Sequence, residues 1–135
     1  MPLVIKLDEL MQKIRKQSYD QFDLVVGIAR GGILPGYLIS RFLNLPFESI
    51  AISFRNDTHA PIYNEPKLMH PVQFDYIHKK ILLVDDVSNS GASLGKAKEI
   101  LSGSTIQTAV ISGTADISFY GPHDQCIQWP WDPQN

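Results

Sequence analysis

Residues 81–94 read ILLVDDVSNSGASL, and the order of residue types in this stretch decides the fold. The run Ile81–Val84 is apolar without alternation, which is typical of a short strand buried on both faces of a parallel sheet. Apolar residues then recur at helical spacing from Leu94 to Leu101. A buried strand, a loop and a helix in this order predict an α/β domain, with Asp85 and Asp86 at the carboxyl end of the strand.

The loop between this strand and this helix has the composition of a phosphate-binding loop. Its backbone N–H groups open a helix and can point at an anion. Ser88 and Ser90 add hydroxyl donors, and Gly91 lets the backbone approach a ligand closely. The candidate phosphate-binding residues are Val87, Ser88, Asn89, Ser90, Gly91, Ala92 and Ser93.

The two carboxylates need a partner other than the phosphate, because they would repel it. A phosphorylated sugar supplies such a partner, since its vicinal hydroxyls can donate to Asp85 and Asp86. A Mg²⁺ ion would then be held by these carboxylates, partly through other oxygens of the substrate. A competing interpretation is that the acid pair only ends a strand in an Asx-type turn.

The whole stretch resembles the phosphoribosyl diphosphate (PRPP) signature of type I phosphoribosyltransferases. That signature has four apolar residues, two acids, three variable residues and Thr-Gly-x-Thr. Here Ser90-Gly91-Ala92-Ser93 fills the last four positions, and serine keeps the hydroxyl of threonine. The resemblance implies a mostly parallel open sheet flanked by helices, one domain over residues 1–135, and an enzyme that transfers ribose 5-phosphate from PRPP to a base.

A second match lies upstream, where the apolar run Leu24–Ile28 precedes Ala29-Arg30-Gly31-Gly32 and a helical pattern. This loop resembles the pyrophosphate loop of the bacterial xanthine-guanine members, which reads Ser-Arg-Gly-Gly. The resemblance implies that backbone N–H groups of residues 29–32 hold pyrophosphate with the Arg30 guanidinium, a third catalytic residue beside the acid pair. A glycine pair that only reverses the chain before a helix is the alternative.

The third match is Cys126-Ile127-Gln128-Trp129-Pro130-Trp131-Asp132, which is similar to the Trp-Ile-x-x-Pro-Trp-Asp segment of the base pocket in those enzymes. The order and spacing of the three motifs agree with that family over residues 20–132. This overall resemblance implies a 6-oxopurine substrate such as xanthine, guanine or hypoxanthine, and a role in purine salvage. Trp129 and Trp131 are alternatively core or subunit-interface aromatics. The resemblance implies base contacts from Asn89, Ser112, Cys126, Ile127, Trp131 and Asp132.

Three of these positions depart from the family pattern. Asn89 stands where purine members have an aspartate that exchanges a proton with the base, and asparagine does not titrate. Ser112 stands where a lysine contacts the purine 6-oxo group, and Cys126 where an aromatic ring stacks on the base. We therefore expect retained sugar-phosphate recognition and altered base recognition.

Two other functions stay open on these residues. A non-catalytic regulatory protein that binds PRPP or a nucleotide would keep the sugar-phosphate loop and need no titratable group at Asn89. A receiver-like signalling domain also places adjacent acids at a strand end. That class expects an acceptor aspartate at a separate strand end, where Asp23 and Asp57 are poorly placed.

Composition excludes several partners. A net charge of −2 and the lack of a Lys/Arg cluster disfavour nucleic acid. No apolar run is long enough to span a membrane, and the first six residues are too short for a signal-peptide core. The single Cys126 excludes an internal disulfide and fits a reducing compartment. We expect a cytoplasmic protein of one domain.

Other motifs fail on their geometry. Gly91–Ala97 resembles a nucleotide P-loop, but only three residues separate its glycines and alanine replaces the metal-binding hydroxyl. Gly27–Gly36 lacks dinucleotide-binding spacing, so no nicotinamide or flavin is expected. The four histidines lack paired ligand spacing, which disfavours zinc. Magnesium is the only cofactor that the sequence predicts.

Alternating strands and helices account for the rest of the chain. Helical patterns are expected from Leu7 and over Ile33–Leu43, and strands over Glu48–Phe54, over Ile106–Ser112 and near Gln125–Gln128. Tyr37, Leu38 and Phe42 are core residues or, by analogy with the family, part of the surface of a homodimer or higher homo-oligomer.

Residues 55–77 have no clear periodicity and are too long for an ordinary connection. In the resembling family a mobile hood occupies this place and covers the bound pyrophosphate. The resemblance implies that the hood brings Arg55, His59, Lys67 and His70 to the substrate, and the alternative is a solvated excursion with incidental charges.

Overall fold

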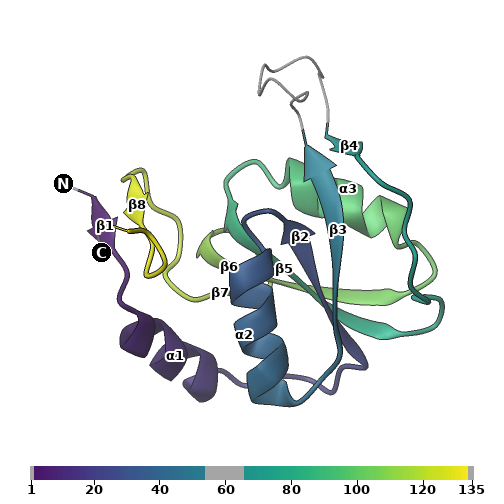
Figure 1. Cartoon of the computed structure of the whole chain (residues 1–135), viewed down its shortest axis with the longest axis horizontal. Coiled ribbons are helices and arrows are strands. Elements are labelled where there is room, and N and C mark those ends of the chain that lie inside the picture. The colour runs from purple at the N-terminus through teal and green to yellow at the C-terminus, as the bar shows by residue number, and fades with distance from the viewer. Residues whose placement is uncertain (1, 54–65, 134–135) are drawn as a thin grey trace.

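The computed structural model describes residues 2–53 and 66–133, which form an α/β fold (Figure 1). The elements in chain order are β1 (Leu3–Val4), α1 (Leu7–Lys16), β2 (Leu24–Ala29), α2 (Ile33–Leu43), β3 (Phe47–Ser53), β4 (Lys67–Leu68), β5 (Lys80–Ser88), α3 (Ala92–Ile100), β6 (Thr105–Gly113), β7 (Ile117–Ser118) and β8 (Ile127–Gln128). Within these two ranges, no helix is both long and apolar enough to cross a membrane.

Most strands belong to one six-stranded sheet with the order β4-β3-β2-β5-β6-β7. Every neighbouring pair is parallel except β3 and β4. A separate two-stranded sheet pairs β1 with β8. The expectation of a mostly parallel sheet flanked by helices is therefore confirmed.

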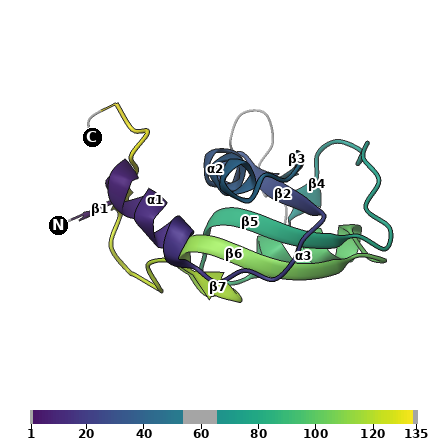
Figure 2. The same ribbon diagram turned by 90° about the horizontal axis from the view of Figure 1, so that it is seen from below.

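Helices cover both faces of the large sheet, with α1 and α2 on one face and α3 on the other (Figure 2). Side chains of β5 alternate between the two cores that this arrangement creates. Ile81 and Leu83 belong to the core under α3. Leu82 and Val84 belong to the core under α1 and α2. A strand buried on both faces is the reason why its sequence shows no alternation.

Two strand predictions differ from the structure. β5 does not end at the last apolar residue but continues to Ser88, because β6 runs beside it and pairs Val87 with Ser112. Apolar residues mark where a strand is buried, whereas backbone pairing extends further into polar sequence. The expected last strand forms at Ile127–Gln128, but it pairs with Leu3–Val4 instead of joining the large sheet. Strands of two residues are too short to have a readable period.

Part of the expected hood packs against the sheet. Leu68 of β4 pairs with Ile52 of β3, and Val72, Phe74 and Tyr76 pack against the core under α3. Of the four residues expected to meet the substrate, Lys67 lies in β4 and His70 follows it. Arg55 and His59 lie outside the described residues.

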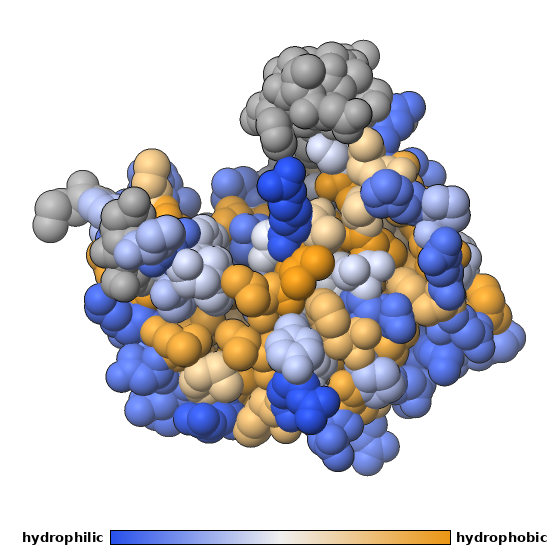
Figure 3. All heavy atoms as spheres, viewed as in Figure 1, coloured by the Kyte–Doolittle hydropathy of each residue, from blue (hydrophilic) through white to orange (hydrophobic). Residues whose placement is uncertain are grey.

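The outward face of α2 is apolar. Tyr37 is 50% exposed and Phe42 is 42% exposed, and apolar residues gather over α2 in the space-filling view (Figure 3). Leu38 is half-buried and packs partly against the core under α1 and α2. Subunit pairing through this face stays a prediction.

Candidate functional site

The strand order creates a switch point between β2 and β5. From β2 the chain crosses through α2 to β3 on one side, and from β5 it crosses through α3 to β6 on the other side. In open α/β sheets, a ligand crevice forms at the carboxyl ends of the two strands where the direction of winding reverses. The two glycine-containing loops of the sequence follow these two strands.

The loop after β2 has no room for side chains at its glycines. A Cβ atom on Gly32 would overlap the Val84 carbonyl of the neighbouring strand and the backbone of Ile28. The Gly32 N–H donates to the Ile28 carbonyl at 2.7 Å, and the peptide bond between Ala29 and Arg30 is cis. Gly32 is the N-cap of α2 and offers no capping side chain. The loop is therefore compact and opens directly into a helix.

Gly31 and Asp86 bring the two loops together. A Cβ atom on Gly31 would overlap the Asp86 carboxylate, so only glycine permits this approach. The candidate pyrophosphate loop and the candidate sugar-binding acid are thus in direct contact, although 54 intervening residues separate them in the sequence. The structure shows that these two motifs are in contact, whereas the sequence indicated only that both belong to the same family signature.

The two acids of β5 are partly tied to their own backbone. Oδ1 of Asp85 accepts the Asp86 N–H at 2.8 Å, and Oδ1 of Asp86 accepts the Val87 N–H at 2.7 Å. Asp85 is only 8% exposed. Burial, followed by the charge and the side-chain hydrogen bond of Asp86, raises the pKa of Asp85 to about 8, although the backbone hydrogen bond acts in the opposite direction. Asp85 therefore keeps its proton near neutral pH.

This acid pair fits the needs of Mg²⁺. Carboxylate oxygens are hard ligands, and protein Mg²⁺ sites commonly use one or two of them together with water and substrate oxygens. Among residues 2–53 and 66–133, no group of three His, Cys, Asp or Glu side chains is arranged to hold a metal ion. An ion bound at Asp85 and Asp86 would displace the proton of Asp85 and would need further ligands from water and substrate.

The loop after β5 is open toward solvent where an anion would bind. Asn89 and Ser90 are exposed, and Gly91 adopts a positive φ of 78° as the N-cap of α3. Gly91 has no side chain to cap the helix, although Oγ of Ser90 accepts the Ala92 N–H at 3.3 Å. Oγ of Ser88 is buried and accepts or donates no hydrogen bond within the described chain. These features support the predicted anion loop.

Gly113 lies very close to the backbone of Ser88, a contact that the sequence did not predict. It has a φ of 109°, and a Cβ atom there would overlap the Ser88 carbonyl. The same carbonyl accepts the Thr114 N–H at 2.8 Å. The available signal was a glycine directly after the predicted strand Ile106–Ser112. β6 therefore packs its last residue directly against the start of the phosphate loop.

Ser112 lies beside Val87, but its hydroxyl already makes a hydrogen bond within the protein. Its side chain is 1% exposed, and Oγ donates to the Gly121 carbonyl at 3.0 Å. The hydroxyl hydrogen is therefore used within the protein. A direct contact of Ser112 with a base stays a prediction.

The remaining candidate base residues lie in and after β8. Cys126 is exposed, and Ile127 pairs with Leu3. The rings of Trp129 and Trp131 are stacked with centroids 5.6 Å apart and planes 5° apart. Both rings pack partly against the core under α1 and α2. Oδ2 of Asp132 accepts the Trp129 N–H at 2.8 Å.

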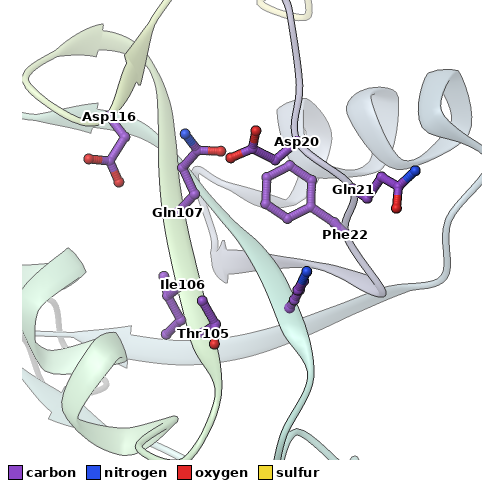
Figure 4. A pocket seen from close by; sticks show the side chains of 8 residues that line it. Asp20, Gln21, Phe22, Thr105, Ile106, Gln107 and Asp116 are labelled. Carbon is purple, nitrogen blue, oxygen red and sulfur yellow. The ribbon is translucent and has the colours of Figure 1, made fainter.

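A cavity of about 590 Å³ opens at the opposite, amino edge of the sheet (Figure 4). The sequence did not predict it. Oε1 of Gln107 is buried there without a hydrogen-bond partner in the described chain, and the side chains of Gln107 and Asp20 point toward one another. The lining residues are Asp20, Gln21, Phe22, Lys80, Thr105, Ile106, Gln107 and Asp116.

The switch point, the acid pair and the two glycine-containing loops together form a candidate site for a phosphorylated ligand at the carboxyl edge of the sheet. Residues 1–115 match the phosphoribosyl transferase domain. The chain belongs to this family, as the sequence motifs indicated.

Known proteins agree on the family but differ in the base. The chain is 35% identical over 94 residues to the orotate phosphoribosyltransferase of Sulfurisphaera tokodaii. The matched region covers 70% of this chain and 44% of the relative. The chain thus matches less than half the length of this curated relative.

Solved structures show the same fold. The purine phosphoribosyltransferase of Pyrococcus horikoshii superposes with a TM-score of 0.80 at 23% identity, covering 97% of this chain and 94% of that one. The xanthine-guanine-hypoxanthine phosphoribosyltransferase of Helicobacter pylori superposes with a TM-score of 0.72 at 15% identity, covering 99% of this chain and 94% of that one. The expected resemblance to purine members is confirmed at the level of the fold.

Proposed function

We propose that this chain binds PRPP and transfers its ribose 5-phosphate to a nitrogenous base, releasing pyrophosphate. The observation that carries the proposal is the contact between Asp86 and Gly31 at the switch point. The contact supports the proposal because Asp86, the proposed sugar-binding acid, lies next to the proposed pyrophosphate loop, as cleavage of the bond between ribose and pyrophosphate needs. Residues 1–135 would act as one domain, with residues 55–77 covering the pyrophosphate.

Each group has a role in this reaction. Asp85 and Asp86 would bind the ribose hydroxyls, and the negative charge of Asp86 would stabilise the oxocarbenium character that develops at the anomeric carbon. Arg30, with the backbone of residues 29–32, holds the departing pyrophosphate. Residues 87–93 hold the 5-phosphate. Bound Mg²⁺ would neutralise charge on the pyrophosphate.

The base is proposed to be a 6-oxopurine. Residues 113–133 contain Asp116, Asp124 and Asp132 but no lysine or arginine. A carboxylate-bearing base such as orotate would find no fixed positive charge in this segment, whereas a neutral oxopurine needs none. Asn89 can hydrogen-bond such a base but cannot exchange a proton with it. Ser112, Cys126, Ile127, Trp131 and Asp132 are the other proposed base-side residues.

A panel assay tests the proposal. The protein is incubated with PRPP, Mg²⁺ and one base at a time, and pyrophosphate release is measured for xanthine, guanine, hypoxanthine, adenine, orotate and uracil. We expect release that depends on a 6-oxopurine. Release with orotate alone would contradict the proposed base while leaving the reaction class intact.

The same experiment separates the enzyme from a regulatory binder. Asn89 lacks the proton exchange that is worth roughly 10²–10⁴-fold in rate, so a protein that binds without turnover is the second candidate. Saturable PRPP binding measured by calorimetry, without pyrophosphate release for any base, would favour that candidate. Absence of both binding and release would refute the sugar-phosphate site.

A further inference from the structure

The segment 126–132 pairs with residues near the amino terminus and not with the large sheet. β8 lies outside the large sheet and pairs only with β1 within the described chain. The Leu3 N–H donates to the Cys126 carbonyl at 2.8 Å, and the Ile5 N–H donates to the Gln128 carbonyl at 3.0 Å. Strands of two residues do not form a stable sheet by themselves, so other contacts must hold this segment in place.

Tyr120 supplies such a contact just before the segment. Its hydroxyl donates to Oε1 of Glu9 at 2.8 Å, and Nζ of Lys13 lies 4.8 Å from the centre of its ring. Glu9 and Lys13 are four residues apart on α1 and therefore face the same side of the helix. Glu9 accepts a hydrogen bond from the tyrosine hydroxyl, and Lys13 makes a cation–π contact with the face of the ring.

The backbone of Tyr120 is fixed as well. Its N–H donates to the Ile111 carbonyl of β6 at 2.8 Å, and its own carbonyl bonds Nε2 of His123 at 2.8 Å. Burial, followed by the hydrogen bond and charge of Glu9, raises the pKa of the Tyr120 phenol, so the hydroxyl remains a donor. Tyr120 thus joins the large sheet, α1 and the linker to β8 at one point.

We propose that Tyr120, held between Glu9 and Lys13, is a positioning residue that sets where segment 126–132 lies and thereby the affinity for the base. This inference rests on the proposed function, because the segment carries base-side residues only if the chain is a phosphoribosyltransferase. Tyr120 acts through the segment and does not touch the substrate.

The chain contains its own reporter for this role. Both tryptophans of the sequence, Trp129 and Trp131, lie in the segment, so the intrinsic tryptophan fluorescence comes from it alone. Their stacked rings pack partly against the core that contains Ile5, Leu10 and Ile14. A displaced segment would expose these rings to water and shift their emission to longer wavelength.

The test is Tyr120→Phe, which removes the hydrogen bond to Glu9 and keeps the ring over Lys13. We expect the KM for the base to rise about three- to tenfold, as the loss of one such hydrogen bond predicts. The KM for PRPP and kcat should change less than about twofold, because the sugar-phosphate residues are untouched. The tryptophan emission of the free protein should shift to the red.

Two further variants complete the experiment. Glu9→Gln keeps an acceptor for the tyrosine and should retain most of the base affinity, whereas Glu9→Leu should reproduce Tyr120→Phe. The matched control is Tyr19→Phe, which also removes one tyrosine hydroxyl bond to α1, since the Tyr19 hydroxyl donates to the Ile14 carbonyl at 2.9 Å. It should leave the emission maximum and the KM for the base unchanged.

The outcomes separate the two proposals. Unchanged emission in both Tyr120→Phe and Glu9→Leu, or an equal rise of the KM values for PRPP and base, would overturn the positioning role. A wild-type protein that releases no pyrophosphate would refute the proposed function instead. In that case the emission shift still decides the role of Tyr120 in placing the segment, because it requires no substrate.

Discussion

The two edges of the large sheet both carry aspartates, but they use them in opposite ways. At the amino edge, Oδ2 of Asp23 accepts the Lys80 N–H at 2.8 Å, and Oδ2 of Asp116 accepts the Thr108 N–H at 2.9 Å. Both of these acids are exposed. At the carboxyl edge, Asp85 is buried beside Asp86, which lies against Gly31. The acids of the amino edge hydrogen-bond to neighbouring strands, whereas the acids of the carboxyl edge lie at the candidate ligand site.

This difference shows that the volume of a cavity does not indicate whether its side chains are suited to binding or catalysis. The cavity of about 590 Å³ lies at the amino edge, where Asp116 is already paired with the backbone. The carboxyl edge combines a buried acid of raised pKa with two glycine loops. A strongly perturbed acid beside a specific charged partner is a mark of a functional site, whereas an empty volume alone is not.

The largest effect is expected from Asp86→Asn. The exchange keeps the shape but removes the charge that we propose faces the sugar, and kcat/KM for pyrophosphate release should fall about 10²–10³-fold, as for loss of one electrostatic stabiliser. The control at the other edge is Asp23→Asn, which should change kcat/KM less than about threefold. Similar losses in both variants would erase the distinction between the two edges.

Gly31→Ala should give the next largest effect. The added Cβ atom would overlap the Asp86 carboxylate and push the pyrophosphate loop from its position. Displacements of this size cost up to about 100-fold, so we expect the KM for PRPP to rise about 10- to 100-fold in steady-state kinetics.

The matched control for this change is Gly95→Ala in α3, where a Cβ atom would meet no atom within 4 Å. Replacing a helical glycine by alanine should raise the free energy of unfolding by about 0.5–1 kcal/mol. A Gly31→Ala protein that binds PRPP like the wild type would show that the contact between the loops is unimportant.

Asp85→Asn should stabilise the protein in a pH-dependent way. The folded-state pKa of about 8 lies above the ordinary value of 3.8, so the stabilising contribution of protonated Asp85 is full below about pH 4 and is lost as the pH rises through 8. Asparagine does not ionise and avoids this loss. In metal-free urea unfolding, the variant should gain at least about 1 kcal/mol over the wild type at pH 9.

The gain should shrink toward zero as the pH falls below 3.8, where wild-type Asp85 becomes protonated in both the folded and the unfolded state. A constant difference between pH 4 and pH 9 would mean that Asp85 does not titrate as described. The same variant should lose activity, since it removes one of the two acids that are proposed to bind the ribose.

The smallest effect on activity is expected from Asp116→Ala at the amino edge. The variant loses the hydrogen bonds from the Thr108 N–H and from its Oγ1, at 2.9 and 3.1 Å. Urea unfolding should show a loss of about 1 kcal/mol, with kcat/KM unchanged within about twofold. A large loss of activity at unchanged stability would assign the amino edge a part in catalysis.

Residues 81–94 were sufficient to predict the centre of the fold. Burial on both faces made residues Ile81–Val84 of β5 apolar without interruption, and the helix Ile33–Leu43 was predicted with the bounds that the structure shows. These elements are readable because one physical requirement, burial of a strand or of a helix face, fixes several consecutive residues.

Contacts between distant segments could not be predicted. Nothing in the local sequence indicates that Gly31 lies against Asp86, that Gly113 lies against Ser88, or that β8 joins β1. The resemblance implies a base contact for Ser112, but the sequence does not indicate that its hydroxyl donates to the Gly121 carbonyl. Such pairings depend on how whole elements cross in space, and a single sequence carries no direct record of that.

The pairing of Leu3 with Ile127 has a consequence for the order of folding. It joins positions near the beginning and the end of the chain, so its formation closes a loop that includes almost every other element. The entropy lost in closing so long a loop is smallest after the rest has condensed, which makes this small sheet a late step. In native-state hydrogen exchange, the Leu3 and Ile5 amides should accordingly lose protection well before those of the central strands.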